Sequence, residues 1–460
     1  MLLRNRLRAQ GYQADLCEGE NGAHRASVFN RILSLEAKRF GPCLASRASV
    51  ADTTSSADAD LVIDLTGRVA RQDRRTLSLT IAGQSSVSAG FAEMFASGDL
   101  PELVVWRGGA AVASATPMIS NMLWLSRAAD ELLAGAAALL EQATHRYFAG
   151  KLSPVAIADT PPPRHGFLRH YLPHAARAAF RQASARLGRR RPFYWQVGYR
   201  QAAGFTPEQA DLGPAVFTVL PDDGERFYAD PFLFAHDGQT FLFVEEFPYA
   251  LGRGVVSVSM LEPAGHFGRP RIVLEEAYHL SYPQVIAHAG EIFMLPESGG
   301  AKRLVLYRAE TFPERWVVDT VLLEGVDIND ATLIRRDGLF YLFATMRVGP
   351  GSASDTMVVY SAADLRGPYT PHRLNPIAID RSGARPGGTI LSQDGRFWLK
   401  VQDGTKRYGG GLGLREILQL DADDVRLGPV LPIAAPITSR FAAIHTFNSA
   451  AGLEVVDSAG

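Results

Sequence analysis

The fold is decided by the stretch YADPFLFAHDGQTFLFVEE at residues 228–246. An apolar run leads into an Asp-Gly turn, and a second run rich in aromatic and branched residues follows. This pattern is typical of a β-hairpin. Similar stretches stand at 280–298, 328–346 and 385–403, and a weaker one stands at 442–459. The sequence therefore predicts five hairpins in its last 240 or so residues.

The five stretches are spaced nearly evenly along the chain. Their turn glycines are separated by 52, 48, 57 and 57 residues, and they are Gly238, Gly290, Gly338, Gly395 and Gly452. A hairpin unit repeated about every 50 residues predicts a β-propeller. We therefore predict an all-β domain at residues 201–460, folded as a five-bladed β-propeller.

Residues 1–150 show a different pattern, in which strands alternate with helices. We predict helices at 2–10 and 27–40, and strands at 61–67, 77–81 and 102–107. A long helix is expected from Thr116-Pro117 to about Ala143. Alternation of this kind predicts a small Rossmann-like α/β domain.

This N-terminal segment resembles the formyltransferase-like domain of some bacterial proteins. The resemblance rests on residues 60–67, on the opening helix with Gly11-Tyr12, and on the late helix. Formyltransferases of this kind need an Asn and a His shortly after the central strands, and residues 61–115 contain neither. We therefore interpret residues 1–150 as a degenerate structural or docking domain.

Residues 151–200 are predicted to be a basic linker. From residue 160 to residue 207 there are nine arginines and no acidic residue, and Arg189, Arg190 and Arg191 are consecutive. A basic helix is expected at 175–187, after the prolines at 161–163. The arginines could contact an anionic membrane surface or a glycan-assembly protein. They could equally form a solvated face, or a clamp against acidic side chains of another domain.

The overall composition argues against several function classes. The net charge of −1 gives no general attraction to nucleic acid. The two cysteines, Cys17 and Cys43, form neither a disulfide framework nor a zinc motif, which fits a reducing compartment. No signal-peptide pattern or membrane-spanning apolar run is present, so we expect a cytoplasmic protein. No cofactor or metal site is expected.

Two sets of polar residues occupy equivalent places in the repeat. Asp230, Tyr282 and Asp330 stand eight residues before their turn glycines, and Glu245 and Glu297 stand seven residues after theirs. Equivalent positions around a repeat form rings, so we expect these side chains at one end of the propeller.

Paired carboxyls at one site can separate an acid from a base, as glycoside cleavage requires. We assign Asp230 as base or nucleophile, Glu297 as acid and Asp330 as the residue that tunes them. The alternative is that these aspartates only cap turns and bind backbone N–H groups.

Further residues are predicted to bind the substrate. Lys406 and Arg407 precede three glycines, a loop that could hold a phosphate or carboxylate or could be an ordinary turn. The other predicted substrate-binding residues are Glu245, Tyr282, His279, Arg385 and His445.

Residues 225–460 resemble the N-terminal domain of plant glucosamine inositolphosphorylceramide transferases and its bacterial relatives. The resemblance lies in FYADPFL (227–233), YHLSYP (278–283), PES (296–298), GVDINDATL (325–333) and KRYGG (406–410). It implies a five-bladed propeller similar to those of arabinanases, invertases and levansucrases. Such hydrolase-like propellers carry an acid Glu, a base or nucleophile Asp and a further Asp on successive blades. Asp230, Glu297 and Asp330 occupy comparable places, whereas Tyr282 stands where another Asp would be expected.

In the plant transferases, glycosyl transfer is attributed to a separate C-terminal domain, for which we expect no counterpart here. The leading hypothesis is a carbohydrate-active protein that acts on a glycosidic bond of a carbohydrate or glycolipid during cell-surface glycan assembly. One alternative is a non-catalytic glycan-binding or scaffolding module, and another is a sugar formyltransferase. We expect a cytoplasmic location, peripheral to the inner membrane.

Overall fold

The computed structural model describes residues 1–16, 28–46, 59–65, 73–120, 122–157, 167–187, 194–214, 216–434 and 443–459. Cys17, residues 66–67, Arg189, Arg190, Arg191 and the first residue of the fifth repeat lie outside these ranges. Among the described residues, no helix has the length and apolar character needed to cross a membrane.

The chain divides into two compact units. The N-terminal unit comprises Met1–Arg190, Val348–Thr356 and Ala378–Asp380. The sheet unit comprises Arg191–Arg347, Met357–Ile377 and Arg381–Gly460.

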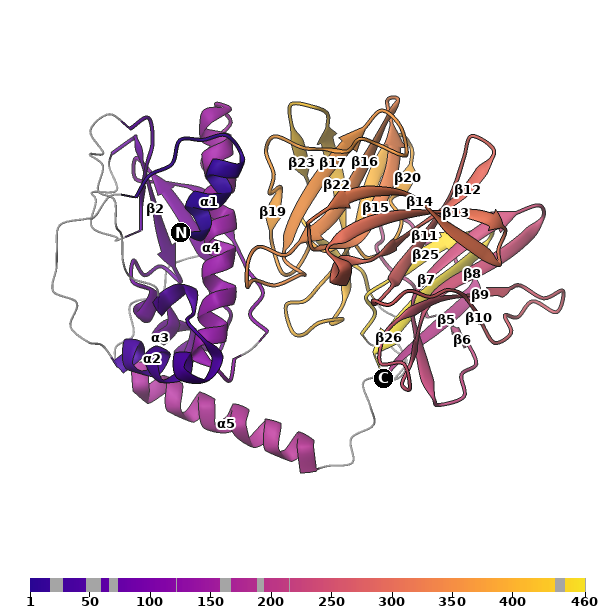
Figure 1. The fold of residues 1–460 in the computed structure, drawn as a ribbon, viewed down its shortest axis with the longest axis horizontal. Helices are drawn as coiled ribbons and strands as arrows, with labels where there is room; N and C mark the ends of the chain where they lie inside the picture. The colour runs from indigo at the N-terminus through magenta and orange to yellow at the C-terminus, as the bar shows by residue number, and fades with distance from the viewer. Residues whose placement is uncertain are drawn as a thin grey trace. The chain divides into compact units, whose positions relative to one another are not determined.

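The N-terminal unit combines helices with one four-stranded sheet (Figure 1). Its helices are α1 (Leu2–Ala9), α2 (Val28–Phe40), α3 (Val87–Ser97), α4 (Leu125–Phe148) and α5 (Phe167–Leu187), with a 3-10 turn at Leu44–Ser46. Its strands, in sheet order, are β1 (Val62–Asp64), β2 (Thr76–Ile81), β3 (Leu103–Arg107) and β4 (Ala110–Ala115), and β19 (Ala378–Ile379) also belongs to this unit. Only the β1–β2 pair of this sheet is parallel, whereas a Rossmann-like fold is built on a mostly parallel sheet, so the predicted Rossmann-like fold is not confirmed.

The long helix begins later than the sequence predicts. It starts at Leu125 rather than at Thr116 and ends at Phe148. The segment before it is held by other partners: the Thr116 N–H donates to the Ile379 carbonyl, and the Met118 N–H donates to the Asp355 carboxylate. Helix α3 and strand β4 were not predicted, although Val87, Phe91 and Phe95 of α3 have helical spacing; β4 is rich in alanine and has no apolar alternation.

The sheet unit contains five antiparallel sheets among its described residues. The first is β7 (Arg226–His236), β8 (Gln239–Pro248), β9 (Val255–Met260) and β10 (Arg271–Leu274). The second is β11 (Ser281–His288), β12 (Glu291–Glu297), β13 (Arg303–Thr311) and β14 (Arg315–Glu324), with a 3-10 turn at Gly299–Ala301. The third is β15 (Ile328–Arg336), β16 (Leu339–Met346), β17 (Thr356–Ala362) and β18 (Thr370–Pro371).

The last two sheets complete this unit. The fourth is β20 (Leu391–Gln393), β21 (Arg396–Gln402), β22 (Leu412–Leu420) and β23 (Val425–Leu427), with β24 (Leu431–Pro432) also paired to β22. The fifth is β25 (Phe447–Ala450), β26 (Leu453–Ala459), β5 (Trp195–Gln201) and β6 (Thr218–Val219).

The fifth sheet joins the two ends of the sheet unit (Figure 1). Strand β26 pairs with β5 over its whole length, from Leu453↔Gln201 to Ala459↔Trp195. Strand β5 lies inside the range predicted to be a linker. The predicted start of the β domain at residue 201 is therefore too late. Strand β5 has no hairpin turn of its own, so the repeat pattern in the sequence did not reveal it.

Each of the five repeats forms the predicted hairpin. The residue before each turn glycine and the glycine itself both have positive φ, from 48° at Asp237 to 82° at Gly338. A two-residue turn with this geometry matches the right-handed twist of the strands it joins. The aromatic residues expected to be core are buried, for example Phe243, Phe293 and Phe343.

Candidate functional site

Three site residues share one unusual backbone feature. Asp230, Tyr282 and Asp330 each have a φ of 49°, a left-handed conformation that is uncommon for residues other than glycine. In each case the pairing register of the hairpin shifts at that position. A bulge of this kind re-aims a side chain and is common beside functional sites. The repeat thus places three non-glycine residues at equivalent bulges.

Asp330 lies in a group that we call the arginine cluster, consisting of Glu297, Asp330, Arg385 and Gln402. The Arg385 guanidinium donates to both oxygens of Asp330, at 2.6 and 3.0 Å. It also contacts Glu297 Oε2 at 3.3 Å, and the Asp330 N–H donates to that same oxygen at 3.2 Å. Gln402 adds a donor to Asp330 Oδ2 at 2.5 Å. Asp330 is therefore fixed by a bidentate ion pair.

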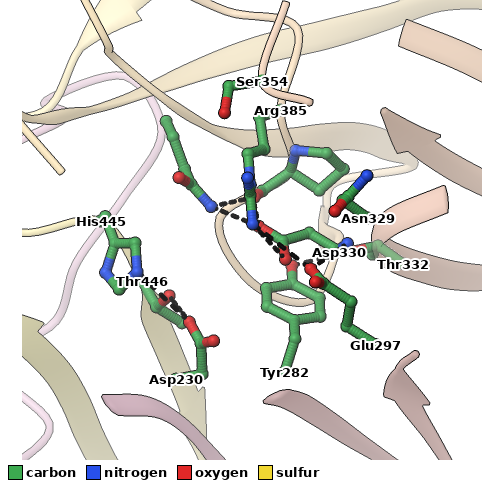
Figure 2. Close-up of polar contacts among 12 residues, drawn as sticks. Asp230, Tyr282, Glu297, Asn329, Asp330, Thr332, Ser354, Arg385, His445 and Thr446 are labelled. Carbon is green, nitrogen blue, oxygen red and sulfur yellow. Dashed lines mark hydrogen bonds and ion pairs between the residues drawn. The ribbon is translucent and has the colours of Figure 1, made fainter. Parts of the chain in front are cut away.

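Asp230 lies in a second group that we call the histidine cluster, consisting of Asp230, His445, Thr446 and Asp457. The Thr446 hydroxyl donates to Asp230 Oδ1 at 2.8 Å, and His445 Nε2 lies 3.6 Å from the same oxygen. His445 Nδ1 lies 2.7 Å from Asp457 Oδ1. Figure 2 shows Asp230, His445 and Thr446 apart from the arginine cluster, with the Tyr282 ring between the two groups in this view.

Asp457 holds the histidine cluster together. Its carboxylate accepts the backbone N–H groups of Asp230, His445 and Thr446, at 2.9, 3.2 and 2.8 Å. Together with the His445 imidazole, this makes four donors on one fully buried side chain. Trp195 stacks on the other side of the imidazole, with ring centroids 4.0 Å apart. The orientation of His445 toward Asp230 is therefore fixed on several sides.

Tyr282 and Glu245 extend the site. The Tyr282 hydroxyl lies 2.8 Å from Thr332 Oγ1 and accepts the Gly388 N–H at 2.5 Å. Glu245 Oε1 lies 3.4 Å from His279 Nε2. Because His279 Nδ1 accepts the Gly254 N–H, the neutral imidazole carries its proton on the nitrogen that faces Glu245.

The charges within the site determine which carboxyls can ionise. Asp230, Glu245, Glu297 and Asp330 are all less than 10% exposed, and Arg385 is their permanent cation. Burial raises the pKa of Asp230 to about 7, although His445 opposes this. Burial, and then the charge of Asp330, raise the pKa of Glu297 well above its usual value.

Asp330 behaves in the opposite way. Burial acts to raise its pKa, but Arg385 outweighs burial, so the pKa of Asp330 lies below its ordinary value. For His445, burial acts to lower the pKa, but Asp457 outweighs it and the pKa is raised. The arginine cluster therefore places Asp330, a carboxyl that favours its ionised form, beside Glu297, a carboxyl that favours its protonated form.

The structure places most of the predicted site residues in a buried class, leaves His279 half-buried and leaves two residues exposed. The buried class is Asp230, Tyr282, Glu245, Glu297, Asp330, Arg385 and His445. Lys406 and Arg407 are exposed, and no described hydrogen bond or ion pair joins them to the four carboxyls. Their neighbour Tyr408 does reach the site, because Arg385 lies over its ring at 5.4 Å.

Sequence reasoning missed Asp457, although a signal was present. Five residues after the turn glycine the copies carry Phe243, Leu295, Phe343, Lys400 and Asp457. The first three are core residues. A charged residue at the same position of the repeat therefore suggests a role other than apolar packing. Both Lys400 and Asp457 are fully buried.

One group of side chains in the described part of the chain could hold a metal ion. Asp230, His445 and Asp457 each offer a ligand atom, and these atoms lie within 4.8 Å of one another. The same atoms already form the hydrogen bonds of the histidine cluster. The expectation that the protein has no metal site stays a prediction.

Comparison with known proteins relates this site to one family. Residues 220–434 match the family model described as "Glucosamine inositolphosphorylceramide transferase 1, N-terminal". The transferase of that name from Oryza sativa subsp. indica is 35% identical over 225 residues, which is 47% of this chain and 30% of that protein. The Arabidopsis thaliana protein is 32% identical over 206 residues, which is 44% of this chain and 27% of that protein. The chain thus spans less than a third of the length of these relatives.

Several solved structures are similar to part of the chain. An α-L-arabinanase from Cellvibrio cellulosa, complexed with arabinohexaose, is 18% identical with a TM-score of 0.33 and covers 46% of this chain and 78% of its own. A family 117 glycoside hydrolase from Zobellia galactanivorans is 12% identical with a TM-score of 0.38 and covers 58% of this chain and 90% of its own.

The family match includes some of the site residues and not others. Asp230, Glu245 and the whole arginine cluster lie inside residues 220–434, whereas His445, Thr446 and Asp457 lie beyond them. The part of this chain that contributes all four carboxyls discussed above is therefore similar to the N-terminal region of glucosamine inositolphosphorylceramide transferases.

Proposed function

We propose that the sheet unit is a five-bladed propeller that acts on a glycosidic bond, in the assembly of a cell-surface glycan or glycolipid. The carbohydrate context is supported by the match of residues 220–434 to a family named for glycosyl transfer to a glycolipid. The single observation that carries the catalytic proposal is that Glu297 and Asp330 share Arg385 in one buried site, where the pKa of Glu297 is raised and that of Asp330 is lowered.

Glu297 is the proton donor in this proposal. A buried carboxyl whose pKa is raised keeps its proton to a higher pH, and burial and the neighbouring Asp330 charge raise the pKa of Glu297 in this way. It gives this proton to the glycosidic oxygen as the bond from that oxygen to the anomeric carbon breaks. Asp330 touches Arg385 and Gln402, so its role is to tune Glu297 rather than to contact the sugar.

Asp230 is the base. Its carboxylate removes a proton from the water or acceptor hydroxyl that attacks the anomeric carbon. A pKa of about 7 suits this role, because a base works best when its pKa is close to the operating pH. Thr446 and His445 hold the Asp230 oxygen in place, and Asp457 orients His445.

A glycan-binding module is the second candidate function. It is favoured by the low exposure of all four carboxyls and by the saturation of Asp330 with donors from Arg385 and Gln402. In that case the carboxyls would stabilise the fold and would accept hydrogen bonds from sugar hydroxyls. Formyl transfer has no comparable support, because the described residues between 61 and 115 include no His or Asn.

The test is a screen of glycosides and activated sugar donors with wild type, Asp230→Asn and Glu297→Gln. Glu246→Gln is the matched control, because Glu246 is equally buried but faces Arg226 and Ser257 instead of the site. We expect turnover by wild type and the control, and a loss of about 100-fold or more in the two site variants. Equal turnover by all four proteins would contradict the proposal. Ligand binding with no turnover by any of them would favour the binding module.

A further inference from the structure

Helix α5 carries apolar side chains on two opposite sides. On one side, Phe167, Tyr171 and His174 pack against Phe95 of helix α3, with ring centroids 6.0, 5.3 and 5.0 Å apart. Tyr171 is buried by this contact. This inner side attaches the helix to the rest of the N-terminal unit.

The other side of α5 is apolar and exposed. Leu168, Leu172, Ala176 and Phe180 are spaced four residues apart, so they lie along one side of the helix, and we call them the outer stripe. Leu168 is 37% exposed, Leu172 is 57% exposed and Phe180 is 74% exposed. The inner side already attaches the helix, so packing among the described residues of the unit does not explain why the outer side is apolar.

The charge around the outer stripe identifies what covers it. Arg169 and Arg177 are exposed beside the stripe. Arg181 and Arg186 follow within the helix, and the segment from 160 to 207 contains no acidic residue. Apolar side chains flanked by arginines, in a segment without acidic residues, suit a lipid surface that is apolar inside and anionic at its headgroups.

We propose that the outer stripe of α5 docks on an anionic lipid bilayer. The helix lies in the plane of the bilayer, with Leu172 and Phe180 among the acyl chains and Arg169 and Arg177 on the lipid phosphates. This places the sheet unit at a membrane surface, as suits a protein that works on a membrane-bound glycolipid. The proposal is independent of the assignments of Glu297 and Asp230.

The experiment measures binding of the full chain to vesicles of phosphatidylglycerol and phosphatidylcholine, and to vesicles of phosphatidylcholine alone. Four proteins are compared: wild type, Leu172→Ser/Phe180→Ser, Arg169→Gln/Arg177→Gln, and the control Val318→Ser/Leu418→Ser. The control removes two side chains of similar exposure that lie on strands of the sheet unit. Circular dichroism of each variant shows that the fold is kept.

We expect wild type and the control to bind the anionic vesicles with equal affinity. The outer-stripe variant loses about tenfold or more in affinity. The arginine variant loses about 25-fold, since each of its two basic residues near an anionic surface strengthens binding about fivefold. High salt weakens wild type and has less effect on the arginine variant.

Several results would overturn the proposal. One is the failure of wild type to bind anionic vesicles, and another is equal binding by the outer-stripe variant. Sedimentation is run in parallel without lipid. A wild-type dimer that Leu172→Ser/Phe180→Ser converts to monomer, without any binding to vesicles, would show that the outer stripe joins two copies of the chain instead.

Discussion

In the arginine cluster, Asp330 is held by a permanent cation, whereas in the histidine cluster Asp230 is held by a hydroxyl and faces an imidazole that can lose its charge. Both aspartates occupy the same left-handed bulge of their hairpins and both are buried. Their pKa values nevertheless move in opposite directions, down for Asp330 and up for Asp230. Equivalent backbone positions thus become chemically different through the partners that other strands supply.

The largest expected effect comes from removing the permanent cation. Arg385→Met leaves Asp330 and Glu297 buried without their guanidinium, and we expect a loss of about 3–5 kcal/mol in the free energy of unfolding, measured with urea. Arg396→Met is the matched control, because the Arg396–Glu416 pair has similar geometry at an exposed site. It should cost much less, because solvent screens an exposed ion pair. Equal losses in the free energy of unfolding for the two substitutions would contradict the claim that Arg385 stabilises the buried carboxyls.

The pH dependence of stability separates the two aspartates. The pKa of Asp230 is raised to about 7 in the folded state from an ordinary value of 3.8. The folded state therefore binds more protons than the unfolded state between these values, so stability falls as pH rises through this window.

Asp230→Asn should remove that fall and stabilise the protein at about pH 8, by up to about 4 kcal/mol. Urea unfolding at about pH 5 and pH 8 measures the effect. Asp237→Asn, in an exposed hairpin turn, should change stability by less than about 0.5 kcal/mol. An Asp230→Asn protein that keeps the wild-type pH dependence would show that Asp230 is ionised throughout.

Lys400 is a buried basic residue outside the arginine cluster, and its ionisation should also affect stability. Its ammonium lies 2.9 Å from the Thr389 carbonyl, and burial lowers the pKa of Lys400 from 10.5 to about 7. The unfolded state then binds more protons between these values, so the contribution of Lys400 makes stability rise with pH in that window. We expect Lys400→Met to remove this rise and to stabilise the protein at about pH 7 by about 1–3 kcal/mol. Destabilisation by Lys400→Met at that pH would show that Lys400 is needed as a charge.

The smallest effect is expected at Tyr282. Tyr282→Phe removes the acceptor of the Gly388 N–H and the partner of Thr332, but leaves both aspartates with their own partners. A loss of about 1–2 kcal/mol is expected, since a buried N–H is left unpaired. Thermal unfolding of this variant, compared with Tyr341→Phe in the core, provides the measurement. A loss as large as that of Arg385→Met would mean that Tyr282 couples the two clusters.

Much of this comparison could be predicted from the sequence, because hairpin turns leave a local signal. The turn glycines placed Asp230, Tyr282 and Asp330 at equivalent positions, and all three occupy the same bulge. The partners that distinguish them could not be predicted, because they are contacts between strands far apart in the chain. Asp457 accepts a hydrogen bond from the Asp230 N–H, although the two residues are 227 positions apart in the sequence. Arg385 and Asp330, which form an ion pair, are 55 positions apart. Strand β5 was missed for a related reason, since its partner β26 lies at the other end of the unit.

The protonation states of Glu297 and Asp330 test the central claim most directly. They can be read from carboxyl carbon resonances of ¹³C-labelled protein at about pH 6, assigned with Glu297→Gln and Asp330→Asn. We predict that the resonance missing from the Glu297→Gln spectrum has the shift of a protonated acid. The resonance missing from the Asp330→Asn spectrum should have the shift of a carboxylate. An ionised Glu297 at that pH would leave the site without its proton donor and would contradict the account.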